Sequence, residues 1–274
     1  MKKEDVSSII IRTIETIVGL EAVRKLEELV WSKEEAVPVN QTMAAVKNGG
    51  FVLGAFSEKQ LIGFQYSFPG FDGEKSYLCS HSLGIHPEFR KYGIGEKLKW
   101  AQKKTAAEKG YNLITWTYDP LETVNGYLNL HKLGAVCSTY LENVYGEMDD
   151  KLNAGIPSDR FLVEWGIKDS KNVSKYDMEG EYPQAIITSI RDGFLIPERI
   201  DVNLRSKTLF VPVPGNFQEL KKYNLSYGAA WREYTQKVFS HYFSSGWKAV
   251  DLVKDRVNPI QYNYLLQREE TGDI

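Results

Sequence analysis

Two glycines one residue apart follow two basic residues in the stretch GIHPEFRKYGIGEKL, positions 84–98. The glycines are Gly93 and Gly95, and the basic residues are Arg90 and Lys91. A helix is expected to follow, and the start of a helix exposes unpaired amide N–H groups at the positive end of its dipole. Glycine lets other atoms approach that backbone closely. The pattern predicts an anion cradle, most naturally for phosphate, although a strand-to-helix turn that merely needs glycine fits these residues equally well.

The segments around this motif alternate between strand and helix patterns. Strands are predicted at 8–14, 51–56, 61–68, 76–85, 112–118, 135–146 and 160–167, and helices at 20–31, 38–48, 93–109 and 122–134. In the helix at 20–31, helical spacing turns Leu20, Val23, Leu26 or Glu27, and Val30 inward. Interleaved strands and helices predict an α/β sheet with helices on both faces.

The composition changes after residue 168, where the polar segment 168–183 reads as a linker. We therefore predict two domains, residues 1–168 and a smaller α+β region at 169–274. The second contains predicted strands near 184–190, 205–213, 246–253 and 261–267, and a helix with an aromatic stripe. The strand–helix–strand order of this region resembles that of the first domain, but Gly-x-Gly is missing at the start of its helix. We interpret the region as a degenerate half-copy of the first domain, with chance similarity as a nearly equal alternative.

The bulk composition narrows the function classes. The chain has 274 residues, a formal charge of −2 and a pI near 6.2, so a duplex-binding surface is not expected. The N-terminal apolar run is only about four residues long, too short for a signal peptide, and no segment reaches membrane-spanning length. Two cysteines in apolar runs predict free thiols in a reducing, cytoplasmic setting. Four scattered histidines and no cysteine pair at ligand spacing argue against a metal site.

The sequence R-K-Y-G-I-G, between a strand and a helix, resembles the GNAT superfamily of acyl-CoA-dependent N-acyltransferases. That family's signature is Arg or Gln, two residues, Gly, one residue, then Gly or Ala, and Arg90, Gly93 and Gly95 match it. The lead-in Ile85-His86-Pro87-Glu88 and the segment HKLGAVCSTYLENVYG also resemble the family. The likeness covers roughly residues 8–167 and implies a mixed central sheet. More narrowly, the sequence resembles a two-part bacterial GNAT subgroup.

The resemblance implies acetyl-CoA or another acyl-CoA as co-substrate, with its diphosphate on the amides of the glycine turn. The pantetheine arm would lie beside residues 82–85, where a backbone N–H would face the thioester oxygen. The implied cofactor-binding residues are Leu83, Gly84, Ile85, Arg90, Lys91, Tyr92, Gly93, Ile94, Gly95 and Glu96, with Asn125 and Asn129 as further candidates.

Acyl transfer to an amine also needs a base. His81, four residues before Ile85, is the leading candidate, with a histidine satisfied in the core as the equally weighted alternative. Asp119 is second, because strand ends border ligand crevices in open α/β sheets, although its Asp-Pro pair can simply form a turn.

The family's usual acid is a tyrosine four residues before the Leu-Gly glycine, and Leu130 stands there. Tyr127 or His131 could substitute, or the thiol, with a pKa near 8.5, could leave unaided.

We therefore expect an enzyme that transfers an acetyl group from CoA to a primary amine, such as that of a free amino acid. Succinyl-CoA is an alternative donor, since Arg160 or Arg191 could meet its carboxylate. The rival functions are a non-catalytic acyl-CoA-binding module and a protein N-acetyltransferase. Neither nucleic acid nor a membrane is expected as partner, and the aromatic stripe fits either a core or a homodimer interface.

Overall fold

The computed structural model describes residues 9–146, 154–168 and 181–268. The chain divides into two compact units, Met1–Trp116 with Gly166–Asp169 and Thr117–Trp165 with Ser170–Ile274. They are called here the N-terminal and the C-terminal unit. Most of the predicted linker lies outside the described residues, and a domain boundary at residue 168 stays a prediction.

The N-terminal unit is built on a mixed sheet in the order β1-β2-β3-β4-β5. Its strands are β1 (Ile10–Thr13), β2 (Phe51–Ser57), β3 (Gln60–Phe71), β4 (Ser76–Ile85) and β5 (Leu113–Tyr118), of which the last two residues fall in the C-terminal unit. Neighbours from β1 to β4 pair antiparallel, whereas β4 and β5 pair parallel. The predicted mixed sheet is confirmed.

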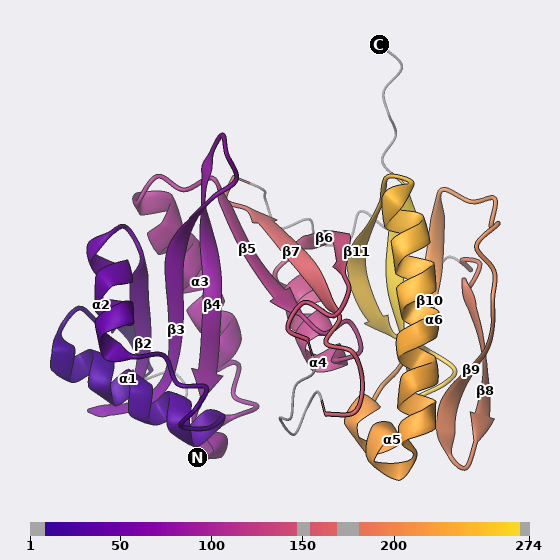
Figure 1. Cartoon of the computed structure of the whole chain (residues 1–274), viewed down its shortest axis with the longest axis horizontal. Helices are drawn as coiled ribbons and strands as arrows, with labels where there is room; N and C mark the ends of the chain where they lie inside the picture. Colours follow the sequence, from indigo (N-terminus) through magenta and orange to yellow (C-terminus); the bar gives the residue numbers. More distant parts are fainter. Residues whose placement is uncertain (1–8, 147–153, 169–180, 269–274) are drawn as a thin grey trace. The chain divides into compact units, whose positions relative to one another are not determined.

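Helices cover both faces of this sheet, α1 (Ile17–Val30) and α2 (Val39–Lys47) on one and α3 (Ile94–Glu108) on the other (Figure 1). The alternation along β3 separates the two faces. Phe64 and Tyr66 join the apolar cluster of α1, while the Ser67 hydroxyl accepts a hydrogen bond from Gln102 of α3 at 2.9 Å. Successive residues of a strand point to opposite faces, so α1 and α3 lie on opposite sides.

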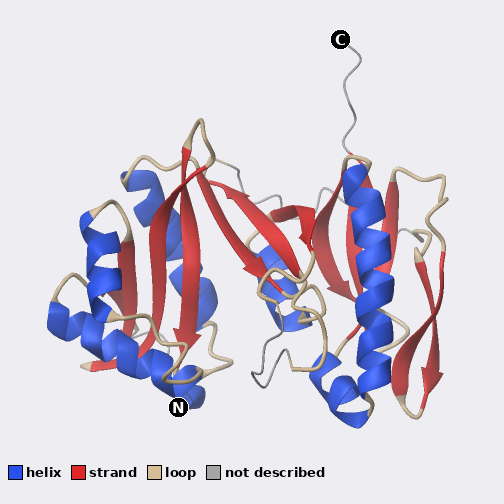
Figure 2. Cartoon of the chain, in the orientation of Figure 1, coloured by secondary structure: helices blue, strands red, loops and turns tan. Residues whose placement is uncertain are grey.

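The C-terminal unit has strands in the order β7-β6-β11-β12-β10 and a separate β8–β9 hairpin (Figure 2). The strands are β6 (Val136–Leu141), β7 (Arg160–Gly166), β8 (Ile186–Arg191), β9 (Phe194–Ile200), β10 (Thr208–Pro214), β11 (Trp247–Lys254) and β12 (Gln261–Arg268). The helical segments are α4 (Thr123–Gly126), a π-helical turn η3 (Tyr127–Lys132), α5 (Phe217–Tyr223) and α6 (Leu225–Ser244).

The aromatic stripe of α6 forms core. Trp231 and Val238 are fully buried and Tyr242 nearly so. Burial of a large aromatic side chain is a main source of stability in a small sheet-and-helix unit. Homodimer formation stays a prediction. Among the described residues, no helix combines the length and the hydrophobicity that crossing a membrane requires.

Candidate active site

The turn between β4 and α3 has a backbone suited to anions. Lys91 and Gly93 both have positive φ, of 70° and 73°. A left-handed backbone conformation is unfavourable for a non-glycine residue such as Lys91. Strain of this kind is often found at functional sites. Gly93 is the N-cap of α3 and, as a glycine, has no side chain that could accept a hydrogen bond from the first turn of the helix. Because the first amides of a helix have no intrahelical acceptor, this turn can offer them to a ligand.

The glycines of this region serve different purposes. A Cβ added at Gly95 would meet only Leu83 Cδ2, at the ordinary distance of 3.5 Å, so the fold itself does not require glycine there. Gly93 is favoured by its positive φ. Gly84 is explained by packing, since an added Cβ would lie 2.5 Å from Phe64 Cε1.

Positive charge borders the turn. Arg90 and Lys91 are both exposed. The Arg90 Nε donates a hydrogen bond to the carbonyl oxygen of Ile85 at 3.3 Å, which holds the guanidinium beside the end of β4. The predicted diphosphate-binding residues therefore lie together at one end of the sheet.

Pairing between β4 and β5 is short and ends before this turn. Their ladder contains two pairs, Leu78↔Ile114 and Cys79↔Thr115. Past Cys79, the described part of β4 has no further pair with β5, so the N–H and C=O groups of this edge are available to an extended ligand. An acyl-pantetheine arm is such a ligand.

A β-bulge lies just past the last pair of this ladder. Tyr66 pairs with Ser82, and the next β3 residue, Ser67, pairs with Ser80, so His81 is an extra residue on β4. A bulge turns the strand and re-aims the side chains that follow it. The sequence did not predict this feature.

Comparison with known proteins identifies this arrangement. The model of the acetyltransferase (GNAT) family matches residues 20–134, which include the glycine turn, the bulge and the short ladder between β4 and β5. Residues 20–134 form a GNAT acetyltransferase domain. No curated protein matches the sequence. The narrower two-part bacterial subgroup stays a prediction.

Solved structures of acetyltransferases are similar at low identity. A GNAT family acetyltransferase from Elizabethkingia anophelis with acetyl-CoA bound is 19% identical, with 58% of this chain and 98% of that chain covered and a TM-score of 0.44. The ribosomal-protein-S18-alanine N-acetyltransferase from Escherichia coli is 13% identical over 61% of this chain and 99% of its own, with a TM-score of 0.48. An N-acetyltransferase from Staphylococcus aureus Mu50 is 16% identical over 58% and 99%, with a TM-score of 0.47.

His81 of the GNAT domain lies beside two aromatic rings. Its ring centroid is 5.5 Å from that of Tyr66 and 5.6 Å from that of Phe68. Part of the ring remains exposed, and partial burial lowers the pKa of His81 below the ordinary 6.5. The neutral imidazole, which can accept a proton, is therefore the main form at neutral pH.

Glu27 of α1 reaches the same strand and is 4% exposed. One carboxylate oxygen accepts a hydrogen bond from the Ser82 hydroxyl at 3.2 Å, and the other accepts one from the Val37 amide at 3.1 Å. Burial raises the pKa of Glu27, against the lowering effect of these hydrogen bonds. Sequence reasoning missed this residue, although helical spacing already placed Leu26 or Glu27 on the inner side.

Lys99 lies on the opposite face and is 4% exposed. Its Nζ donates to the Ser80 hydroxyl at 2.8 Å and lies 3.3 Å from the centroid of the Trp116 ring. Burial lowers the pKa of the Lys99 amine well below its ordinary value, and the nearby Cys79 opposes this shift. No sequence pattern singled out Lys99.

The other predicted residues belong to the C-terminal unit. Asp119 is 7% exposed and accepts hydrogen bonds from both terminal nitrogens of Arg232, as well as from the Leu121 amide at 2.9 Å. Arg160 Nη1 lies 3.8 Å from the same carboxylate. These contacts favour a structural role for Asp119, and its predicted role as a base stays untested.

The two candidates for a general acid form one cluster. The rings of Tyr127 and His131 stack with centroids 4.5 Å apart, and His131 Nδ1 lies 3.0 Å from Asp251 Oδ1 of β11. Leu130, at the position of the family's tyrosine, is 2% exposed.

The two asparagines differ in exposure, since Asn125 is exposed and Asn129 is buried. Their predicted contacts with the cofactor stay predictions.

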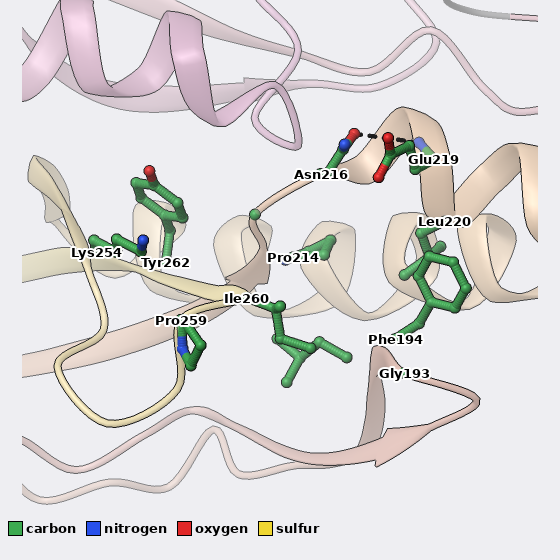
Figure 3. A pocket seen from close by; sticks show the side chains of 12 residues that line it. Gly193, Phe194, Pro214, Asn216, Glu219, Leu220, Lys254, Pro259, Ile260 and Tyr262 are labelled. Atoms are coloured by element: carbon green, nitrogen blue, oxygen red, sulfur yellow. Dashed lines mark hydrogen bonds between the residues drawn. The ribbon is translucent and has the colours of Figure 1, made fainter.

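A cavity of about 310 Å³ lies in the C-terminal unit, where β10 leads to α5 (Figure 3). Its lining mixes the exposed Lys254 with apolar residues such as Pro214 and Ile260. The amide of Gly215 in this turn donates to the Ile260 carbonyl oxygen at 2.7 Å. The Gly215 amide is therefore already hydrogen-bonded within the protein and is not available to a phosphate group.

Proposed function

We propose that the protein is an N-acyltransferase that moves a short acyl group, acetyl or succinyl, from a CoA thioester to a primary amine. The observation that carries the proposal is the glycine turn of α3 beside the open edge of β4. In this proposal the amides of residues 92–96 bind the diphosphate, with help from Arg90 and Lys91. Each hydrogen bond to a charged group contributes about 1.5–3 kcal/mol, so three or four of them anchor the nucleotide.

The edge of β4 holds the reactive end of the donor. The pantetheine amides pair with residues 82–85, and an amide N–H between Leu83 and Ile85 donates to the thioester oxygen, where negative charge develops. The amine nitrogen attacks the thioester carbon and His81 takes its proton. The C–S bond then breaks, and CoA leaves as a thiolate that gains a proton.

The acceptor amine approaches from the α1 face. His81 contacts Tyr66, whose side chain belongs to that face, and Glu27 bonds there to Ser82. An α-amine titrates near 8 and a lysine amine near 10.4, so a base with a lowered pKa suits the α-amine better. This supports a small molecule such as an amino acid as acceptor. Two free cysteines support a reducing, cytoplasmic location.

One observation favours a second candidate, a non-catalytic acyl-CoA-binding module. Leu130 stands where the family's acid tyrosine would be, and it is buried. A module that only senses acyl-CoA needs no such acid.

A panel of free amino acids, other small amines and a folded protein, each incubated with acetyl-CoA or succinyl-CoA, tests the proposal by release of free thiol. Amine-dependent thiol release with a small amine supports the enzyme. CoA binding without release under any condition favours the sensing module, and release only with the folded protein favours a protein N-acetyltransferase.

A further inference from the structure

The buried amine of Lys99 lies where the ladder between β4 and β5 ends. The last pair of their ladder is Cys79↔Thr115, and the residues that follow are Ser80 and Trp116. The Lys99 Nζ contacts both of them, at 2.8 Å from the Ser80 hydroxyl and 3.3 Å from the Trp116 ring centroid. It therefore bridges the two strands from the α3 face, at the point where they begin to separate.

The Lys99 amine has no acidic partner in the described part of the chain. Its interactions there are with the Ser80 hydroxyl, the Trp116 ring and, electrostatically, the Cys79 thiol. The face of an indole ring compensates a buried ammonium group only in part. Burial without an acidic partner favours the neutral amine, in line with its lowered pKa. An anionic ligand would supply the missing partner and favour the ammonium form.

The direction of the bound donor, as proposed above, brings its acyl group to this amine. The diphosphate lies at the turn after Ile85, and the pantetheine arm runs along β4 toward Ser80. Five residues of strand separate these positions, which is about 16 Å at 3.3 Å per residue. The far end of the acyl chain is then the part of the donor nearest to Ser80 and Lys99.

We propose that Lys99 binds a carboxylate at the far end of the acyl chain, so that the preferred donors are CoA thioesters of short dicarboxylic acids. Succinyl-CoA is the reference donor of this class. The inference rests on the proposed function. The sequence predicted Arg160 or Arg191 as the partner of the succinyl carboxylate. In the structure these arginines already pair with Asp119 and Glu198, so we assign the carboxylate to Lys99 instead.

Calorimetric binding and thiol-release assays with succinyl-CoA and butyryl-CoA test this inference. The two acyl groups have the same number of carbons, and only succinyl carries a carboxylate. We expect wild-type protein to bind succinyl-CoA at least about tenfold more tightly, an energy difference of about 1.4 kcal/mol. Lys99→Met should remove this preference and Lys99→Arg should keep most of it. Lys104→Met, on the exposed side of the same helix with a side chain that is 80% exposed, should leave it unchanged.

The donor panel on wild-type protein is informative even if Lys99→Met fails to fold. Equal or weaker binding of succinyl-CoA than of butyryl-CoA overturns the inference while leaving acyl transfer intact. A succinyl preference that survives Lys99→Met in a folded protein also overturns it. If neither free CoA nor any thioester binds, the proposed function fails, and the inference fails with it.

Discussion

Ser80 and Ser82 are two positions apart on β4, yet their hydroxyl groups bond to helices on opposite faces of the sheet. The Ser80 hydroxyl accepts from Lys99 of α3, and the Ser82 hydroxyl donates to Glu27 of α1. In a regular strand, residues i and i+2 point to the same face. The extra residue, His81, reverses this relationship. One bulge thus places an amine on one face of β4, and a histidine and a carboxyl group on the other.

Gly95→Asp should separate ligand binding from folding. A Cβ added at Gly95 meets only Leu83 Cδ2 at 3.5 Å, and an aspartate is favourable in the first turn of a helix, where Gly95 lies. The free energy of unfolding should therefore stay about the same. CoA affinity should fall by about tenfold or more, because the carboxylate would stand beside the diphosphate and repel it. Lys104→Ala on the same helix is the control, and unchanged CoA affinity in Gly95→Asp would count against the cradle.

His81 should set the acid limb of the pH profile. Because partial burial lowers its pKa, the neutral imidazole persists below pH 6.5, and kcat/KM should fall only at a lower pH. His81→Ala should lose this limb and reduce kcat by roughly 10²–10⁴-fold, with the dissociation constant for CoA unchanged. If the limb and the rate both survive the substitution, another group is the base.

Glu27→Gln should destabilise the protein in a pH-dependent way. Because burial raises the folded-state pKa above 4.5, the stability that the bound proton contributes is complete below pH 4.5 and is lost as pH rises through the folded-state pKa. Glutamine does not ionise, so the stability deficit of the variant should be larger at pH 4.5 than at pH 7.5. Urea unfolding at both pH values measures this, and a deficit that grows with pH would mean a lowered pKa.

Asp119→Asn should mainly lower the free energy of unfolding. Removing one partner of a buried ion pair costs about 3–5 kcal/mol, because the charge of Arg232 is left uncompensated. Glu198→Gln, which breaks the exposed pair with Arg191, is the control and should cost about 0–1 kcal/mol. A variant of Asp119 with full stability and no activity would restore this residue as the base.

Features that depend on local sequence were predictable. The strand at 76–85 has the predicted bounds, and the helix predicted at 93–109 spans Ile94–Glu108. The Gly-x-Gly spacing predicted the turn at the start of α3 because helix starts and left-handed turns have direct residue preferences. Strand β9 was missed because Pro197, Glu198 and Arg199 interrupt its apolar pattern.

Features that depend on pairing between distant segments were not predictable. The bulge at His81 exists only in the register with β3, and SYLCSHSLGI carries small and apolar residues at both parities. Lys99 and Glu27 stand out only through their hydrogen bonds to Ser80 and Ser82, which lie far from them in the sequence. The helix predicted at 122–134 is a short α4 followed by a π-helical turn, a difference set by backbone hydrogen bonds that residue types do not specify.

The central claim is that backbone amides at the start of α3 bind the diphosphate of CoA. A crystal structure of the complex with CoA tests it most directly. The account predicts diphosphate oxygens within hydrogen-bond distance of amide nitrogens from residues 92–96, with pantetheine along the open edge of β4. A diphosphate bound elsewhere on the protein, with this turn unoccupied, would contradict it.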